Sequence, residues 1–472
     1  MEGDTYDVIV IGAGLSGMAA ALRLGMFGKK TLLLEKHYVV GGLNSFYARK
    51  GRKFDVGLHA LTNFPSEHSK KKSPLLKLCR QLRIPYESLE LEPQSHSKIV
   101  FGDSTLKFDN DFSYFIEQIQ RNFPDSINQF LSFLKLMEEF PAYSVDAPSI
   151  STRKILSESK MNPLLSEMLL CPTCYYGSAQ SNDIDFPTFI MLFDAIFRQG
   201  LARPRKGIRS ILDPLCKKLS EFNVERRMNE GVKKLHIKDD KINKIELESG
   251  EFIESKQIIS TCGLLETETL LTTKNQLTDD SAVGKFSVIE SISILRGMPA
   301  DYSWDETIIF FNDSEKFMYD CPQNLVDMRS GVICLPENYG SKEKVDDFKL
   351  RITHPANFDL WQKLDENLYH KEKQKYEETI FSNALKYLNK KQDSKIDPRQ
   401  QVIFRDTFTP RTIKQFTSHE NGTLYGSPTK TRDGSTRYKN LFLAGTDQGY
   451  VGIVGALLGG IAIANNKILK PS

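Results

Sequence analysis

Cysteine and tryptophan are scarce in this sequence of 472 residues, which contains 7 Cys and 2 Trp. The cysteines are irregularly spaced along a long chain, so they do not outline a disulfide framework, and a reducing compartment is expected. An excess of charge of one sign is also missing, because 63 basic residues balance 60 acidic ones. This balance gives no indication of a nucleic-acid partner. The histidines lack metal-ligand spacing, so no metal site is predicted.

Long uninterrupted hydrophobic runs are missing as well. The apolar residues 8–11 are too few for a signal peptide, and no positive charge precedes them. Residues 441–464 are apolar over nearly the length of a membrane span, but Asp447 and Gln448 interrupt them. A cytoplasmic location, or a peripheral one on the cytoplasmic face of a membrane, is therefore expected.

The most specific pattern lies near the amino terminus. An apolar run at residues 7–11 leads into glycines spaced Gly-x-Gly-x-x-Gly, then a helical segment and a second apolar run that ends at Glu35. In this pattern Gly12 permits a sharp turn, Gly14 lets the backbone approach a pyrophosphate, and Gly17 lets helix and strand pack closely. The helix start offers free N–H groups and a positive dipole end to the phosphates. A carboxylate at Glu35 accepts ribose hydroxyls, which favours FAD or NAD over NADP.

The residues that follow favour FAD over NAD. A second glycine pair, Gly41-Gly42, is expected where an extended dinucleotide needs further backbone contact, and Phe54-Asp-Val-Gly-Leu-His59 comes after it. Together these segments resemble the amino-terminal half of the FAD-dependent phytoene desaturase, carotenoid isomerase and retinol saturase family. The segment ending at His59 is closer to the saturase and isomerase branches than to the desaturases. One departure is Leu43, which stands where the family often has Arg.

A second segment near the carboxyl terminus also resembles this family. A strand-like run, residues 438–445, is followed by a small-residue turn containing Asp447 and by a glycine-rich helix. The resemblance implies that this unit lies against the isoalloxazine end of FAD, with Asp447 reaching the ribityl and phosphate region. The helix start would face the pyrimidine edge, where its dipole stabilises an anionic reduced ring. The predicted FAD contacts are Gly12, Ala13, Gly14, Ser16, Gly17, Glu35, Lys36, Gly41, Gly42, Leu43, Gly445, Asp447, Gly452, Ile453 and Val454.

The resemblance implies an α/β fold, with a Rossmann-type FAD-binding domain of the glutathione-reductase kind and an inserted α+β substrate domain. The FAD-binding domain is expected to be discontinuous, with residues 1–65, 200–263 and 401–472, and residues 74–199 and 264–400 are expected to form the substrate-binding, largely helical domain. Apolar spacing predicts helices from Phe112 and from Phe130, and a charged amphipathic helix at about 364–390. Strands are predicted at residues 233–237, 244–248, 257–261, 286–295, 308–311 and 332–335.

His59 is the candidate catalytic residue, because the family folds this segment beside the flavin. An imidazole there would protonate the carbon opposite hydride delivery or hydrogen-bond a flavin carbonyl, and a structural role is the alternative. Cys171-Pro-Thr-Cys174 is either a redox dithiol or a pair of structural cysteines. No thioredoxin-like pattern surrounds this pair, which favours the structural interpretation.

An aromatic segment, Phe186–Phe197, precedes a basic cluster formed by Arg198, Arg203, Arg205 and Lys206. Two interpretations are open. The segment would dip into an anionic bilayer and admit a lipophilic substrate, or it would be an internal helix above the active site. The internal helix is the favoured interpretation, because most aromatic side chains fill protein cores.

The sequence therefore predicts an FAD-dependent oxidoreductase acting on conjugated or isolated double bonds of a hydrophobic polyene or isoprenoid, of carotenoid or retinoid type. The reaction would be desaturation, saturation or cis–trans isomerisation, with hydride transfer at flavin N5. The alternatives are a flavin amine oxidase-like enzyme on a polar amine and a non-catalytic FAD-binding protein. A second Gly-x-Gly-x-x-Gly is missing, so electrons would come from a transiently bound partner such as NAD(P)H, or leave to oxygen or a membrane quinone. A redox-neutral isomerisation that needs only reduced FAD would also fit. The exact substrate is set by pocket shape, which no motif encodes.

Overall fold

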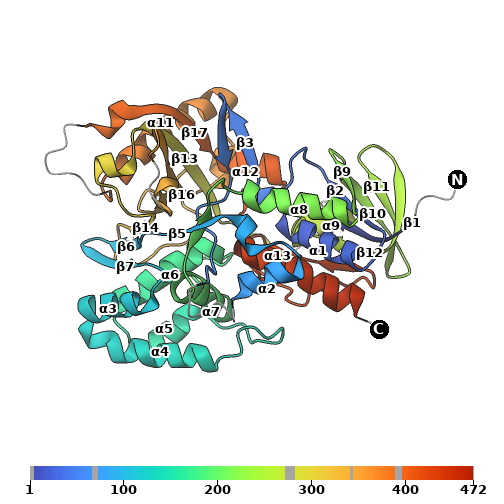
Figure 1. Cartoon of the computed structure of the whole chain (residues 1–472), viewed down its shortest axis with the longest axis horizontal. Coiled ribbons are helices and arrows are strands. Elements are labelled where there is room, and N and C mark those ends of the chain that lie inside the picture. The colour runs from blue at the N-terminus through green and yellow to red at the C-terminus, as the bar shows by residue number, and fades with distance from the viewer. Residues whose placement is uncertain (1–4, 66–72, 272–281, 341–343, 389–395, 471–472) are drawn as a thin grey trace.

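The computed structural model describes residues 5–65, 73–271, 282–340, 344–388 and 396–470. Two seven-stranded sheets organise this part of the chain. In Figure 1 the first sheet lies on the right, the second lies at the upper left, and a layer of helices lies below the second sheet. The α/β class, with a Rossmann-type domain and a second domain containing both helices and strands, is confirmed.

The first sheet carries the predicted nucleotide-binding unit. Its strand order is β10-β11-β12-β1-β2-β9, with β18 beside β12, and β9, β2, β1, β12 and β18 run parallel. The apolar runs in β1 and β2 are buried on both faces, as parallel strands covered on two sides require. The strand bounds are β1 (Thr5–Ile11), β2 (Thr31–Glu35), β9 (Glu225–Met228), β10 (Val232–Lys238), β11 (Lys241–Leu247), β12 (Phe252–Ser260) and β18 (Leu441–Leu443).

Three helices cover one face of this sheet. They are α1 (Leu15–Met26), α8 (Arg209–Glu221) and α13 (Gly452–Ile463), and their apolar side chains share one core with β1 and β2. The stretch Gly452–Leu469 is long and apolar enough to cross a membrane by composition, with a mean hydropathy of 1.5. It packs against α1 instead of standing apart: a Cβ on Gly460 would lie 2.0 Å from the carbonyl oxygen of Ser16. This close approach explains the glycine at position 460.

The second sheet has the strand order β17-β13-β16-β15-β14-β6-β7. All neighbouring strands are antiparallel except β14 and β6. The strands predicted near 286–295, 308–311 and 332–335 are confirmed as β13, β14 and β15, whereas β16 and the β6–β7 hairpin were not anticipated. The bounds are β6 (Ser97–Phe101), β7 (Ser104–Phe108), β13 (Ser287–Arg296), β14 (Ile308–Asn312), β15 (Ser330–Cys334), β16 (Asp347–Ala356) and β17 (Val402–Phe408).

Two expected domain boundaries differ from the structure. β17 pairs with β13 in the second sheet, so the return to the nucleotide-binding domain comes later than residue 401. The helix α2 (Pro74–Gln81) buries Leu75 and Leu78 in the core of the first domain, so the first excursion begins after residue 74. Both differences arise because strand pairing and helix packing between distant segments leave no local mark in the sequence.

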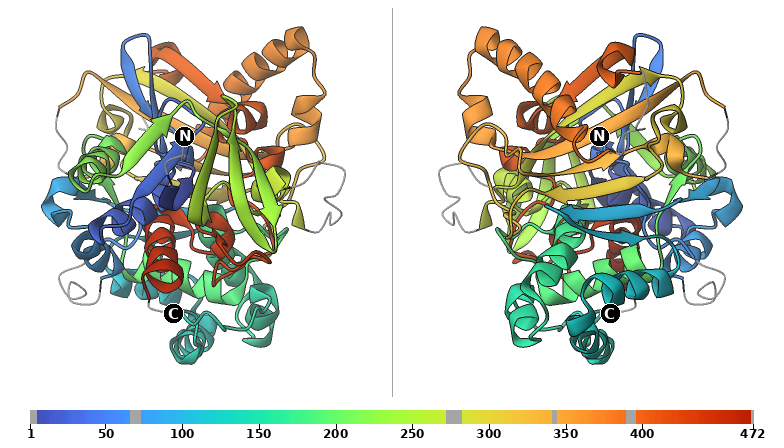
Figure 2. Two further views of the ribbon diagram at one scale, coloured as in Figure 1. Left: turned by 90° about the vertical axis from the view of Figure 1, so that its right-hand side faces the viewer. Right: turned by 90° about the vertical axis from the view of Figure 1, so that its left-hand side faces the viewer.

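The helical layer lies below the second sheet, and Figure 2 shows it from two sides. It contains α3 (Phe112–Asn122), α4 (Ile127–Glu139), α5 (Thr152–Glu158), α6 (Pro163–Gly177) and α7 (Phe186–Phe193). The helices predicted from Phe112 and Phe130 are therefore confirmed. Phe186, Phe189, Phe193 and Phe197 are fully buried in the core of this layer. Of the two interpretations, the structure therefore favours the internal helix, because these four aromatic side chains are not exposed.

The basic cluster after this helix is neutralised by local acids. Arg198 lies 2.9 Å from Glu138, Arg205 lies 2.8 Å from Glu92, and Lys206 lies 2.8 Å from Glu90.

The remaining described strands and α-helices connect the two sheets or flank them. They are β3 (Phe46–Arg49), β4 (Arg52–Asp55), β5 (Leu91–Pro93), β8 (Ala202–Pro204), α9 (Leu264–Leu271), α10 (Phe358–Gln362), α11 (Glu366–Ala384) and α12 (Pro410–Thr417).

Candidate active site

One cavity of about 820 Å³ joins the carboxyl edge of the first sheet to a face of the second sheet. Its nucleotide half is formed by the β1–α1 turn, the end of β2, residues 41–44 and the start of α13. Its other half, called here the chamber, is bounded by α6, by strands β13 to β17 and by the segment around His59. The predicted cofactor contacts that line the cavity are Gly12, Gly14, Ser16, Glu35, Lys36, Gly41, Gly42, Leu43, Gly445, Gly452 and Ile453.

The β1–α1 turn has the shape of a phosphate cradle. Gly12 has φ +98°, and a Cβ on Gly17 would lie 1.9 Å from the Gly12 carbonyl oxygen, so both positions require glycine. Around Gly14, in contrast, a Cβ would meet no protein atom within 4 Å. The α1 N-terminus has no side-chain cap, and the buried Ser16 hydroxyl has no hydrogen-bond partner among the described residues. Free N–H groups, an unused hydroxyl and open space fit a dinucleotide pyrophosphate.

Glu35 is held in place at the end of β2. Its carboxylate accepts the backbone N–H of Ala13 at 2.7 Å and that of His37 at 2.8 Å. One hydrogen bond to each oxygen leaves further lone pairs on both oxygens for ribose hydroxyls. Ala13 does not line the cavity, yet its amide fixes the acid that does.

The start of α13 forms the opposite end of the nucleotide half. Gly452 has φ +72° and open space around its Cβ position, and the helix has no side-chain cap. Tyr450 and Val451 line the cavity beside it. The uncapped N–H groups and the positive dipole end suit the electron-rich edge of a flavin ring. The residues present at both helix starts therefore fit FAD.

Asp447 is placed differently from the sequence-based expectation. Its carboxylate accepts the backbone N–H of Leu264 at 2.6 Å and of Ser427 at 2.8 Å, and it lies 3.2 Å from the Lys430 ammonium. These donors hold the carboxylate outside the cavity. Asp447 thereby links α9 and residues 427–430 to the turn before α13. Gly17 and Val454 also lie outside the cavity lining, as parts of the packing beneath it.

His59, the candidate catalytic residue, lines the chamber. Its Nε2 lies 3.4 Å from the Thr353 hydroxyl and 3.5 Å from the Glu290 carboxylate. Burial lowers the pKa of His59, although the Glu290 charge opposes the shift. The imidazole is therefore neutral at neutral pH, with its outer nitrogen held only by long contacts. His59 remains a candidate for a proton-moving role.

A buried ionic cluster beside His59 was missed by sequence reasoning. The Arg351 guanidinium lies 2.6 Å from Glu290, and Arg203 lies 2.6 Å from Asp55. Burial opposes ionisation of Glu290, but the Arg351 and His59 interactions outweigh it and lower the pKa of Glu290 to about 2. The sequence signal that could have revealed this cluster was Glu290, the single acidic residue within the mostly apolar β13.

Both arginines also hold the backbone that carries His59. Arg351 donates to the carbonyl of Leu58 at 2.9 Å and to that of Val56, and Arg203 donates to the carbonyls of His59, at 3.1 Å, and Leu58. Since Arg351 lies on β16 and Arg203 on β8, segments from three parts of the chain meet at His59.

Cys171 and Cys174 lie in α6, are fully buried and do not line the cavity. Burial raises the pKa of both thiols well above the usual range, so neither is activated as a thiolate. This placement supports the structural interpretation over the redox dithiol.

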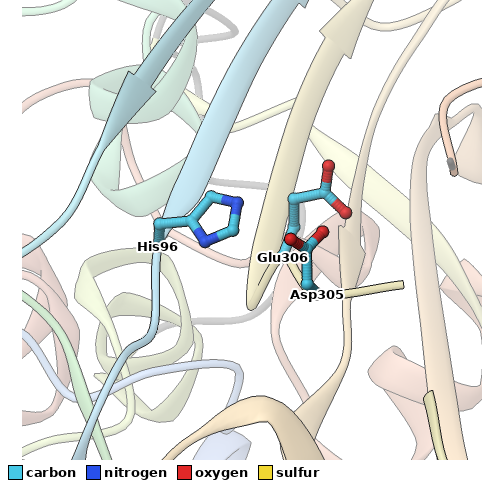
Figure 3. Close-up of side chains that lie close together, drawn as sticks. All are labelled: His96, Asp305 and Glu306. Carbon is cyan, nitrogen blue, oxygen red and sulfur yellow. The ribbon is translucent and has the colours of Figure 1, made fainter. Parts of the chain in front are cut away.

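A second cluster lies away from the cavity. Figure 3 shows His96 beside Asp305 and Glu306, and their ligand-forming atoms all lie within 4.8 Å of one another. The Lys98 ammonium lies 2.5 Å from Glu306, which compensates one acidic charge without an ion. The structure brings these side chains together although their spacing in the sequence gives no metal motif.

Comparisons with known proteins agree with this geometry. A family model described as flavin containing amine oxidoreductase matches residues 15–466. A chloroplastic prolycopene isomerase of Daucus carota is 23% identical over 476 residues, which covers 91% of this chain and 73% of the relative. A 4,4'-diaponeurosporene oxygenase of Staphylococcus aureus is 27% identical over 282 residues, which covers 54% of this chain and 55% of the relative. The resemblance to carotenoid-type flavoenzymes is thus confirmed.

Solved structures show the same fold. An oxidoreductase from Methanosarcina mazei aligns over 97% of this chain and 100% of its own, with a TM-score of 0.64 and 14% identity. A putrescine oxidase bound to putrescine aligns over 99% of this chain and 100% of its own, with a TM-score of 0.63 and 13% identity. Given the family match over nearly the whole chain and a cavity that fits the dinucleotide, this protein is an FAD-dependent oxidoreductase that belongs to the flavin containing amine oxidoreductase family.

Proposed function

We propose that this oxidoreductase acts on double bonds of a hydrophobic polyene or isoprenoid, by desaturation, saturation or cis–trans isomerisation. When bound, FAD supplies hydride acceptance or donation to such a reaction. The observation that carries the proposal is the apolar part of the chamber, which opens directly onto the nucleotide half of the same cavity. Its lining includes Val288, Phe310, Val332, Leu424 and Val451.

The chain's own residues would bind the polyene and move a proton. The apolar side chains exclude water from the chamber, and the arginine-held backbone fixes His59 at its wall. A neutral imidazole at this point would exchange a proton with the carbon that reacts, because its Nε2 lies 3.4 Å from Thr353 and 3.5 Å from Glu290 and is not tightly held by either. The two relatives, named as an isomerase of prolycopene and an oxygenase of diaponeurosporene, also support a carotenoid-type substrate.

A polar amine substrate is the alternative, because putrescine oxidase shares the fold. Among the described residues, the lysines lining the cavity are Lys36 and Lys414, and Lys36 directly follows Glu35, the proposed ribose contact. The Glu290 carboxylate is already paired with Arg351, so it is a poor partner for a substrate ammonium. These observations favour the polyene.

The test is product analysis after anaerobic incubation of FAD-loaded protein with phytoene or retinol in detergent. Oxidised and dithionite-reduced samples are compared by chromatography, together with the Val332→Trp variant, whose larger side chain fills the chamber. We expect a desaturated, saturated or isomerised product from the wild type and none from Val332→Trp, with equal FAD content in both. Conversion of putrescine, with both polyenes unchanged in both redox states, would overturn the proposal.

A further inference from the structure

Five cavity residues form one row across the second sheet. In the strand register, Phe408 of β17 is opposite Glu290 of β13, which is opposite Thr353 of β16. Thr353 is opposite Val332 of β15, and Val332 is opposite Phe310 of β14. All five side chains line the same cavity. The row therefore runs perpendicular to the strands as a continuous floor of the chamber.

Phe408 forms the β17 edge of this floor, and from Glu290 onward the floor changes from polar to apolar. Glu290 and Thr353 are its polar part, and His59 contacts both of them. Val332 and Phe310 follow, and the row continues beyond the chamber through Ile99 of β6 into the hydrophobic core. With neighbouring strands about 4.8 Å apart, the distance from β13 to β14 is about 14 Å. A floor of this length accommodates a molecule with one polar and one apolar end.

The polar end carries no net charge. Glu290 is paired with Arg351, Asp55 is paired with Arg203, and burial keeps His59 neutral. Arg351 and His59 both approach the same carboxylate oxygen, Oε1, and among the described residues no hydrogen bond is directed to Oε2. A charge-balanced site with a carboxylate oxygen, a threonine hydroxyl and an imidazole suits a neutral hydroxyl, which both donates and accepts.

We propose that the substrate is amphiphilic and binds across the strands, with a neutral hydroxyl end against Glu290, Thr353 and His59 and a hydrocarbon end on Val332 and Phe310. The inference rests on the proposed function for its hydrocarbon part, and it narrows the substrate class from hydrophobic polyenes and isoprenoids to isoprenoid alcohols. Thr353 is then a residue that determines specificity, because its hydroxyl would bind the hydroxyl of the substrate. The Thr353→Val variant tests this role, since it removes the hydroxyl and keeps the shape of the side chain.

The test is calorimetric titration of FAD-loaded protein with farnesol and with β-farnesene, a matched alcohol and hydrocarbon, in the same detergent. The quantity compared is the ratio of the two Kd values, because partitioning into detergent cancels when variants are compared. We expect at least about tenfold tighter binding of farnesol by the wild type, as one or two well-placed hydrogen bonds provide. In Thr353→Val most of this preference should disappear while β-farnesene binds as before.

Two further variants separate recognition from folding. Thr407→Val removes a buried hydroxyl on β17 that contacts Ser291 on the other side of the sheet, and it should leave the ratio unchanged. Thr353→Ser keeps a hydroxyl and should restore the farnesol preference. Equal binding of both ligands by the wild type, or a ratio unaffected by Thr353→Val, would overturn the inference. Tighter binding of farnesylamine than of farnesol would contradict the charge-balance argument.

These outcomes are independent of product formation. A farnesol preference that depends on Thr353 would stand even where phytoene and retinol are both left unchanged, which would remove only the reaction proposed above. Conversion of phytoene with no alcohol preference would leave the reaction and remove the inference.

Discussion

At the scale of single residues, Glu35 is the proposed contact to the ribose of FAD. It accepts two backbone N–H groups, from Ala13 and His37, and it faces the cavity. We expect Glu35→Ala to weaken FAD retention at least about tenfold, since hydrogen bonds to a charged group contribute about 1.5–3 kcal/mol each. Flavin content after gel filtration measures this loss. Asp7→Ala, which removes an acid at the other end of the same strand pair, is the control, and normal occupancy in Glu35→Ala would contradict the ribose assignment.

His59 gives a prediction about turnover instead of binding. The side chain lies at the chamber wall, and its backbone is held by Arg203. We expect His59→Ala to slow turnover by a factor of about 10²–10⁴, the range for a lost general acid or base, while the flavin absorbance spectrum stays intact. Steady-state rates with an accepted polyene provide the measurement. An unchanged rate would remove His59 from the mechanism.

At the scale of elements, the β1–α1 turn separates two roles of glycine. Gly14 has φ −66° and open space around it, whereas a Cβ on Gly17 would lie 1.9 Å from the Gly12 carbonyl oxygen. Gly14→Ala should therefore leave the apoprotein's Tm nearly unchanged but weaken FAD binding, because the added methyl group occupies the approach of the pyrophosphate. Gly17→Ala should lower both the Tm of the apoprotein and its affinity for FAD, because the turn itself must shift. Thermal unfolding of apoprotein with a parallel FAD titration distinguishes the two, and a large fall in apoprotein Tm for Gly14→Ala would contradict the cradle.

Elements with a strong local pattern were predictable from the sequence. The nucleotide half depends on one turn and two helix starts, and the glycines that shape them are close in sequence. The chamber is different, because Glu290 and Thr353 become neighbours only through the pairing of β13 with β16. The strand β16 does carry a local signal that was overlooked, because the apolar residues at 348, 350 and 352 alternate with polar ones at 349, 351 and 353, as in a half-buried strand.

For Asp447, the sequence predicted the position in the backbone but not the contacts of the side chain. Its position in the turn before α13 was correctly identified, but the direction of its side chain depends on Leu264, Ser427 and Lys430, which come from other segments. A family pattern places a residue in the backbone, whereas the donors around it decide where the carboxylate points. Non-local hydrogen bonds of this kind are beyond sequence reasoning.

At the scale of the whole molecule, buried titratable groups in the second sheet make stability depend on pH. His354 of β16 is fully buried, where Nδ1 contacts the Ser330 carbonyl, and burial lowers the pKa of His354 to about 4. The unfolded chain binds this proton below pH 6.5, so the free energy of unfolding should fall between pH 6.5 and 4. The loss from this group is about 3 kcal/mol.

Glu290 adds a second acid-sensitive contribution. Its pKa is lowered from 4.5 to about 2, so its stabilisation is complete above pH 4.5 and is lost as the pH falls toward 2. Urea unfolding from pH 7 to pH 4 gives the His354 contribution as the difference between the wild type and His354→Gln, because His59, whose pKa is also lowered by burial, titrates in both proteins. The wild type should lose stability over this range, and His354→Gln should show a flatter profile. Parallel profiles for the two proteins would contradict the assignment.

The whole account depends on a nucleotide cleft and an apolar chamber that form one working cavity. Anaerobic stopped-flow absorbance tests this most directly, when FAD-loaded protein in each redox state is mixed with phytoene or retinol and both the flavin and polyene bands are followed. The account predicts bleaching of oxidised flavin, reoxidation of reduced flavin, or a changed polyene spectrum with flavin still reduced. No change in the flavin or polyene band in either redox state, together with bleaching of the oxidised flavin by putrescine, would contradict it.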